Sequence, residues 1–293
     1  MQARQGAAIS KMTYLGIDGG GSKTTFLVVD DEDQEICRVQ AGPSNWLSVG
    51  REAAAAAIHD GVAQLKGPTP DVVCGGFAGA GRQEGSEFYR GVLERLLPKS
   101  RVRVESDGVI AYAGAIGLKP GVLLIAGTGS IAIGRKSGGS MIRVGGWGPH
   151  FGDEGSGFWI GREAVRVALR SLDSDEDSSF ARRIASALGV TSVKDVVARW
   201  ASGTLSVPGI AALFPEIIAM WPDEPAASIL RAAAAHLKLI TETAVQRVGV
   251  SPYPLSISGS VATSPIIRHL IGFTFDGAKA PPEKGAILLA RAT

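Results

Sequence analysis

The segment LGIDGGGSKTTFLVVD, residues 15–30, decides the fold. It predicts an apolar strand, a glycine-rich turn and a second apolar strand. Backbone N–H groups of such a turn can converge on phosphate oxygens, and Asp18 offers the carboxylate that a phosphate-bound magnesium ion needs. A Walker A loop would place glycine directly before lysine and then open a helix, whereas here Ser22 precedes Lys23 and a strand follows. The segment therefore predicts a phosphate-binding β-hairpin, with a glycine-rich hairpin that binds no ligand as the alternative.

The composition is that of a globular protein with one large core or two medium ones. The chain has 293 residues, is 45% hydrophobic and carries a formal net charge of +2. Because Lys and Arg form no run, we expect no nucleic-acid partner. No apolar run is long enough to cross a membrane, and the first eleven residues lack the apolar core of a secretory signal. We expect residues 1–11 to be disordered. We also expect the protein to be cytoplasmic and to have no membrane partner.

A strand, a glycine turn and a strand occur again in the middle of the chain. An apolar strand at 122–126 ends in Gly127-Thr128-Gly129-Ser130, and two further strands follow at 131–135 and 141–144. Two such hairpins, each opening an α/β half, predict a nucleotide in the cleft between the halves. A third glycine turn, at 258–260, follows a strand that begins at Leu255.

The remaining pattern alternates strands and helices up to about residue 117 and is mostly helical after residue 155. The longest helix is apolar nearly all round its N-terminal half, so we expect that half to be buried. The spacing predicts further strands at 35–40, 72–78 and 102–105, and helices at 51–65, 84–97, 109–115, 155–172, 226–248 and 285–291.

Three of these motifs, in this order, resemble the phosphate 1, phosphate 2 and adenosine motifs of the sugar kinase–actin–Hsp70 superfamily. They are Asp18–Thr24, Gly127–Ser130 and Ser258–Ser260. The segment GGWGPHFGDEGS, residues 145–156, resembles the signature of the N-acetylglucosamine kinase group within the BadF/BadG/BcrA/BcrD family. The resemblance extends over the chain from Met12.

The resemblance implies an α/β fold with two ribonuclease-H-like (actin-like ATPase) domains and a nucleotide cleft between them. Residues 1–117 plus 281–293 would form the first domain, and residues 118–280 the second. The implied activity is transfer of a phosphoryl group from ATP to the 6-hydroxyl of an amino sugar, namely N-acetylglucosamine, glucosamine or a close relative. Similar proteins are commonly homodimers.

Site residues are also implied by the resemblance. Asp107 matches the catalytic base, and Asp18 would hold Mg²⁺ through water. The positions that match ATP contacts are Gly20, Gly21, Ser22, Lys23, Thr24, Gly127, Thr128, Gly129, Gly259 and Ser260. The positions that match sugar contacts are Asn45, Asp107, Ser130, Gly146, Trp147, Gly148 and Asp153.

Three of these residues also have an ordinary structural explanation. Asp107 follows an apolar strand, where α/β folds bind ligands, but it could also cap the following helix. Both roles can hold, since a cap fixes the direction of the carboxylate. Asp153 could hydrogen-bond a sugar or favour the next helix by its charge. Trp147 could flank a sugar ring or pack in the protein.

Two departures leave the sugar open. Ile131 stands where N-acetylglucosamine kinases carry asparagine, and Val144 where some carry cysteine. Because an apolar side chain cannot hydrogen-bond an acetamido group, glucosamine or another hexosamine derivative is also a candidate substrate.

Two other functions are alternatives. ATP-driven activators of acyl-CoA dehydratases share a [4Fe–4S] cluster across a dimer, but Cys37 and Cys74 lie in expected strands and not at a helix end, which disfavours cluster binding. Both cysteines stand beside apolar residues, so we expect reduced thiols and not a disulfide. A non-catalytic sugar sensor usually adds a helix-turn-helix segment before the first hairpin, and eleven residues are too few for one. A zinc-dependent relative would need a cluster of Cys and His residues, whereas the four histidines show no metal-ligand spacing.

Overall fold

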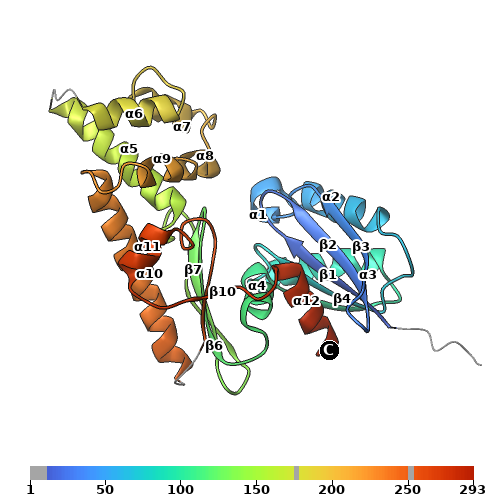
Figure 1. The fold of residues 1–293 in the computed structure, drawn as a ribbon. Coiled ribbons are helices and arrows are strands. Elements are labelled where there is room, and N and C mark those ends of the chain that lie inside the picture. The colour runs from blue at the N-terminus through green and yellow to red at the C-terminus, as the bar shows by residue number, and fades with distance from the viewer. Residues whose placement is uncertain (1–11, 175–177, 250–253) are drawn as a thin grey trace, which may run out of the picture. The chain divides into compact units, whose positions relative to one another are not determined.

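The chain forms two compact units. The computed structural model describes residues 12–174, 178–249 and 254–293 (Figure 1). The described part of residues 1–117, together with Lys279–Thr293, makes the first unit, and the described part of Leu118–Ala278 makes the second. The expectation of disorder for residues 1–11 lies outside the described residues.

A five-stranded mixed sheet with the order β3-β2-β1-β4-β5 forms the centre of the first unit. β1 pairs antiparallel with β2 and parallel with β4, and the register brings Gly19 opposite Thr24, so residues 20–23 close a hairpin. β2 and β4 are apolar and almost completely buried, as expected of strands covered on both faces. The strands are β1 (Thr13–Gly19), β2 (Thr24–Asp30), β3 (Glu35–Ala41), β4 (Val72–Phe77) and β5 (Arg101–Ser106).

The last helix of the chain belongs to the first unit. It packs against β1 and α4, and Ile287 lies in a buried cluster with Leu27 and Val29. The approach is close, because a Cβ at Gly16 would lie 2.2 Å from the carbonyl oxygen of Glu283. The helices of this unit are α1 (Trp46–Val49), α2 (Arg51–Ala63), α3 (Gln83–Leu96), α4 (Asp107–Ile116) and α12 (Pro282–Arg291).

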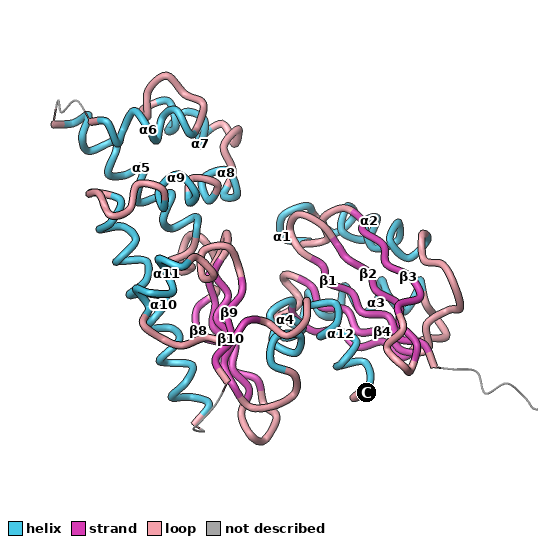
Figure 2. Tube along the Cα trace, in the orientation of Figure 1, coloured by secondary structure: helices cyan, strands magenta, loops and turns pink. Residues whose placement is uncertain are grey.

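The second unit repeats the sheet topology of the first. Its sheet has the order β10-β9-β6-β7-β8, in which β6 pairs antiparallel with β7 and parallel with β9. Figure 2 shows the strands of this unit in magenta and its helices in cyan. β6 and β7 thus correspond to β1 and β2, which confirms the repeated hairpin predicted from the sequence. The strands are β6 (Gly121–Ala126), β7 (Ser130–Arg135), β8 (Met141–Gly145), β9 (Leu255–Ser258) and β10 (Asp276–Gly277).

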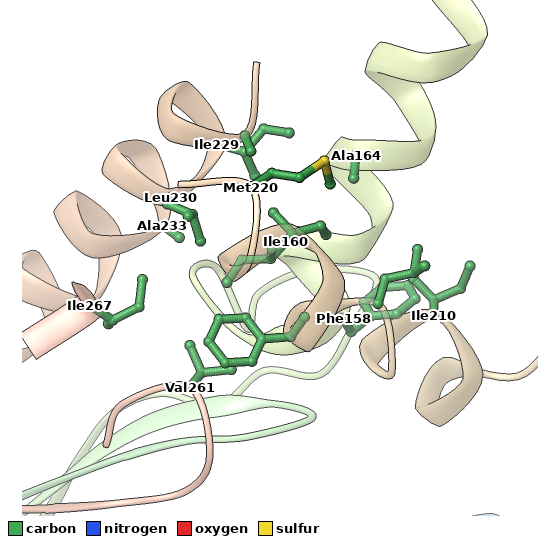
Figure 3. Packing of buried hydrophobic residues seen from close by; sticks show 14 of the residues in the cluster. Phe158, Ile160, Ala164, Ile210, Met220, Ile229, Leu230, Ala233, Val261 and Ile267 are labelled. Atoms are coloured by element: carbon green, nitrogen blue, oxygen red, sulfur yellow. The ribbon is translucent and has the colours of Figure 1, made fainter. Parts of the chain in front are cut away.

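Helices supply most of the hydrophobic core of the second unit. Side chains of α5, α8 and α10 meet there with those that follow β9, including Phe158, Ile210, Leu230 and Val261 (Figure 3). One face of the N-terminal half of α10 is buried, but its opposite face is exposed at Ser228, Arg231 and Ala235, so the expected burial of the whole half is met only on one side. The helices are α5 (Gly157–Asp173), α6 (Ser179–Ala187), α7 (Asp195–Ala201), α8 (Val207–Ala211), α9 (Phe214–Ile218), α10 (Ala226–Val248) and α11 (Pro265–Ile271).

The elements that were predicted with bounds agree with the structure within a few residues. Helices α6 to α9 lie in the region predicted only to be mostly helical. The sequence analysis predicted no element at the short helix α1, which begins at Trp46, nor at α11 and β10. Among the described residues, none of the helices is both long enough and apolar enough to span a bilayer.

Candidate functional site

The hairpin between β1 and β2 presents its backbone to open space. We call residues 20–23 the first turn. Gly20 N donates to Lys23 O at 3.0 Å and closes the turn, and a Cβ added at Gly21 would meet no atom within 4 Å. Ser22 and Lys23 are exposed. The turn is therefore accessible to a ligand that binds N–H groups.

Thr24, which also matches an ATP contact, lies inside the unit. It is completely buried, and its hydroxyl oxygen lies 2.8 Å from Gly42 O and 2.7 Å from Ser44 Oγ. Its side chain therefore supports the first turn from within the protein.

A loop that contains Asn45 is attached directly to the first turn. Ser44 N and Asn45 N both donate to the carbonyl oxygen of Gly20, at 3.0 and 3.2 Å. Asn45 is the N-cap of α1, where its Oδ1 atom accepts from Leu47 N at 3.1 Å. The structure thus places Asn45, a residue predicted to bind the sugar, beside the turn predicted to bind phosphate.

Tyr89, which the sequence analysis did not select, holds this loop from the inside. Its completely buried ring stacks on Phe77 with the centroids 4.1 Å apart. The phenol oxygen lies 2.6 Å from Ser44 O and accepts from Trp46 N at 3.2 Å. Burial raises the pKa of Tyr89 to about 12, so the phenol remains a hydrogen-bond donor at neutral pH. Its only sequence signal is a tyrosine on the apolar face of a helix.

Three carboxylates interact at the end of β1. Burial, followed by the charges of Glu283 and Asp107, raises the pKa of Asp18 to about 6, while Lys23 opposes the shift. Glu283, in the first turn of α12, is itself buried and pairs with Arg38 at 2.5 Å. The sequence analysis selected Asp18 and Asp107 but not Glu283, which lies far away along the chain.

Asp107 is the first residue of α4 and does not cap it. The cap is Ser106, whose Oγ accepts from Val109 N at 3.4 Å. Asp107 Oδ1 accepts from Gly108 N at 2.9 Å, and the residue is exposed. The capping alternative considered for Asp107 is therefore wrong, and its carboxylate lies at the carboxyl end of β5, where parallel strands place ligand-binding groups.

The second turn, residues 127–129, has the same open geometry as the first. Gly127 N donates to Gly129 O at 3.0 Å, and a Cβ at Gly127 would meet no atom within 4 Å. The carbonyls of Gly127 and Thr128 accept from Gly157 N (2.7 Å) and Phe158 N (3.2 Å), at the start of α5. Thr128 is exposed.

The third turn packs against the end of β6. Gly259 has a φ of +91°, and a Cβ there would lie 2.3 Å from the carbonyl oxygen of Ala126. The same carbonyl accepts from Val261 N at 3.0 Å and Ala262 N at 3.1 Å. Ser260 is exposed. The structure therefore brings the second and third predicted nucleotide motifs together.

Ser130 and Asp153 meet in the loop that follows β8. Ser130 Oγ donates to Glu154 O at 2.8 Å, and Asp153 accepts from the backbone N–H groups of Gly148 and Ser130. Burial is the main cause that raises the pKa of Asp153. Asp153 has a φ of +58°, uncommon for a residue other than glycine. Its carboxylate thus fixes the shape of this loop.

The other predicted sugar contacts lie in the same loop. Trp147 is 69% exposed, and the Arg143 guanidinium lies 4.4 Å from its ring centroid, so Trp147 is not a core residue. Gly146 has a φ of +70°, and a Cβ there would lie 2.7 Å from Ile131. Gly148 adjoins open space. The apolar side chain of Ile131 therefore lies directly beside the predicted sugar loop.

Magnesium chemistry fits the surroundings of Asp18. The like charges of Glu283 and Asp107 disfavour its ionised form, and a bound cation would relieve that repulsion. Mg²⁺ usually keeps several waters and needs only one or two carboxylates beside substrate phosphates. Within the described ranges, no group of three or more His, Cys, Asp or Glu residues is arranged to hold a metal ion.

Comparison with known families gives a match over most of the chain. Residues 15–273 match the BadF/BadG/BcrA/BcrD ATPase family. The chain belongs to this family. The N-acetyl-D-glucosamine kinase of Dictyostelium discoideum is 31% identical over 86% of each chain. The N-acetylmuramic acid/N-acetylglucosamine kinase of Clostridium acetobutylicum is 37% identical over 54% of each chain.

Solved structures confirm the predicted fold class of this family member. A candidate N-acetylglucosamine kinase from Chromobacterium violaceum superposes with a TM-score of 0.79 at 24% identity, covering 96% of this chain and 99% of that one. At this identity the likeness shows the fold. It agrees with the two mixed five-stranded sheets and their helices.

Proposed function

We propose that this protein is an ATP-dependent hexosamine kinase that phosphorylates the 6-hydroxyl of an amino sugar. The observation that carries the proposal is the 31% identity to an N-acetyl-D-glucosamine kinase over 86% of both chains. The accessible first and second turns support it, because phosphoryl transfer depends mainly on positioning and charge neutralisation.

The phosphates of ATP are the proposed ligands of the two open turns. Backbone N–H groups around Gly21 and Ser22, and those around Gly127 and Thr128, bind phosphate oxygens. Both glycine positions adjoin open space, so a phosphate can approach the backbone closely. Lys23 is exposed beside the first turn and adds positive charge, and Gly259 and Ser260 approach the adenosine.

Asp107 is the proposed general base that accepts the proton of the sugar 6-hydroxyl. Its exposed position supports this role, and the hydrogen bond from Gly108 N to Oδ1 orients the carboxylate while Ser106 supplies the helix cap. A positioned base contributes roughly 10²–10⁴-fold to such a reaction. Asp18 would hold Mg²⁺ through water, and the ion supplies positive charge to the phosphates when bound.

The amino sugar is the proposed ligand of Asn45, Asp107 and the 146–153 loop. Asn45 would bind it from the loop attached to the first turn, and the exposed face of Trp147 would flank the sugar ring. The Ser130 hydroxyl and the Asp153 carboxylate are held by backbone partners, so their hydrogen bonds with the sugar would come from the remaining lone pairs.

The test is ADP release, coupled to a reporter enzyme, with ATP and a panel of sugars. The panel contains glucosamine, N-acetylglucosamine, N-acetylmannosamine, N-acetylmuramic acid and glucose. We expect sugar-dependent ADP release with an amino sugar and little with glucose. No sugar-dependent release with any amino sugar would overturn the proposal.

The same panel decides between acetylated and free amino sugars. Ile131 beside Gly146 favours a substrate that makes no hydrogen bond at that position, so glucosamine is the first alternative to N-acetylglucosamine. We also propose that the protein is a homodimer, as the resemblance to related kinases implies, and that it is cytoplasmic, as its sequence predicts. Light scattering during gel filtration measures the molar mass against the 30.3 kDa of one chain.

The positions of the cysteines do not favour an electron-transferring activator. Cys37 lies in β3 and Cys74 in β4, both in strands as predicted, and Cys74 is completely buried. Burial raises the pKa of Cys74 to about 12, which disfavours the thiolate that an iron–sulfur cluster requires. Iron analysis of the purified protein tests this alternative, which predicts a brown, iron-containing dimer.

A further inference from the structure

One chain of hydrogen bonds joins a buried phenol to both loops of the proposed site in the first unit. Tyr89 Oη lies 2.6 Å from Ser44 O and accepts from Trp46 N at 3.2 Å. Between these two contacts, Ser44 N and Asn45 N donate to the carbonyl oxygen of Gly20. The short segment 44–46 is therefore held by Tyr89 on one side and by the first turn on the other.

This connection leaves little freedom for separate movement. The Gly20 carbonyl has two lone pairs, and the two N–H groups of adjacent residues occupy both. The stack on Phe77, with an interplanar angle of 10°, fixes the ring that carries the phenol. The same phenol also lies 3.1 Å from the carbonyl oxygen of Ala78, just past β4. A shift of Asn45 must consequently move Gly20 as well.

We propose that Tyr89 is a positioning residue that holds the Asn45 loop and the first turn in one geometry and so couples amino-sugar binding to nucleotide binding. This inference rests on the proposed kinase function. The bound sugar orders Asn45, and the two hydrogen bonds to Gly20 transmit that order to the turn that binds phosphate. A second ligand then loses less conformational entropy on binding, which gives positive cooperativity.

Tyr89→Phe is the sharpest test because it removes only the hydroxyl. The ring keeps its stack on Phe77, whereas Ser44 O and Trp46 N lose a buried partner. Tyr14→Phe is the matched control, since it removes a phenol in the same unit whose hydroxyl makes a long contact, 3.9 Å, with Met12 Sδ. Melting temperatures of both variants show that they are folded.

The first measurement is the dissociation constant of the preferred amino sugar, with and without ADP, together with KM and kcat. For Tyr89→Phe we expect the sugar KM to rise about tenfold, which corresponds to the free energy of one lost buried hydrogen bond. The change in kcat should be much smaller. The gain in sugar affinity produced by ADP should differ from that of wild type, because a loop that Tyr89 no longer holds must be ordered by whichever ligand binds first. Tyr14→Phe should behave as wild type. A Tyr89→Phe variant with wild-type KM and wild-type coupling would overturn the inference.

A second measurement does not depend on catalysis. Amide hydrogen exchange at Ser44 and Asn45 should be faster in Tyr89→Phe than in wild type, while exchange at Gly157 stays unchanged. Equal exchange in the two proteins would also overturn the inference. If the wild type phosphorylates no amino sugar, the proposed function fails, but the exchange measurement still decides whether Tyr89 holds the two loops together.

Discussion

The first and second turns have the same topology but are held in place by different means. The first turn is fixed by a distant loop, through the hydrogen bonds of Ser44 and Asn45 to Gly20. The second is fixed by its own continuation, through the hydrogen bonds from the start of α5 to Gly127 and Thr128. Both leave one glycine, Gly21 or Gly127, facing open space.

The two units also differ in charge beside the turn. Asp18, Asp107 and Glu283 interact electrostatically near the first turn, whereas Asp153, near the second turn, accepts backbone N–H groups. Two units with the same fold can therefore carry different chemical groups. The first unit carries the groups proposed for proton transfer and metal binding, whereas the turn of the second unit is held by backbone hydrogen bonds from α5. The predictions below test this division, beginning with the largest expected effect.

Replacing the proposed base should have the largest effect. Asp107→Asn keeps the size of the side chain but removes its ability to accept a proton. We expect kcat to fall by roughly 10²–10⁴-fold while the dissociation constant of the amino sugar changes little. Steady-state kinetics and calorimetry measure the two quantities. Near-normal turnover would exclude Asp107 from the chemistry.

Filling the third turn should damage the second unit structurally. In Gly259→Ala the new methyl group would lie 2.3 Å from Ala126 O, at a φ of +91°. We expect a loss of unfolding free energy on the order of 3 kcal/mol, seen in urea unfolding. Gly272→Ala is the control, because its φ is +78° but nothing lies within 4 Å. It should cost only about 1 kcal/mol, and equal losses in both variants would contradict the argument.

Neutralising Asp18 should stabilise the apoprotein while it impairs catalysis. The folded state raises its pKa from 3.8 to about 6, so the folded protein binds more protons than the unfolded chain between these pH values. Ionised Asp18 therefore destabilises the fold as pH rises through this range. At pH 7.5, with a chelator present to remove metal ions, Asp18→Asn should add roughly 2 kcal/mol to the free energy of unfolding. This value is reduced from that of the full pKa shift to allow for solvent screening.

The same variant should show no gain near pH 4, where Asp18 is largely protonated in the folded protein. Asp31→Asn serves as its control, because Asp31 is exposed on the turn between β2 and β3. That substitution should leave stability unchanged at both pH values. A gain for Asp18→Asn that is the same at pH 4 and pH 7.5 would show that charge is not the cause.

Adding a methyl group to either open turn should have the smallest effect on stability. Gly21→Ala and Gly127→Ala place a Cβ where nothing lies within 4 Å, so we expect changes within about 0.5 kcal/mol. The KM for ATP should rise in both, because the methyl group occupies the space of an approaching phosphate. An unchanged KM in one of the pair would show that its turn does not bind the nucleotide.

Local sequence patterns predicted the elements that hold the candidate site. The two hairpins follow from glycine runs between apolar strands, and the predicted helix at 226–248 coincides with α10. The four-residue helix α1 was missed because so short an element has no periodicity. Its only signal was Asn45, a residue type that favours the N-cap position.

Contacts between distant residues could not be predicted in this way. Tyr89 lies 45 residues from Ser44, and Arg38 lies 245 residues from Glu283, yet each pair is in direct contact. No local pattern records such a pairing, because it depends on how strands and helices pack. For Asp107 the pattern placed the residue between a strand and a helix, as observed, but it named Asp107 and not Ser106 as the possible cap of α4, although Ser and Asp are both good caps.

The docking of α12 on β1 and α4 has a consequence for biosynthesis. Lys279–Thr293, which contains α12, completes the first unit. During synthesis, the sheet of the first unit therefore lacks this helix until residues 118–278 have been translated. The second unit is continuous and can fold as soon as it leaves the ribosome. A premature stop codon shortly after residue 278 would thus leave the second unit whole, whereas the first unit would lack α12.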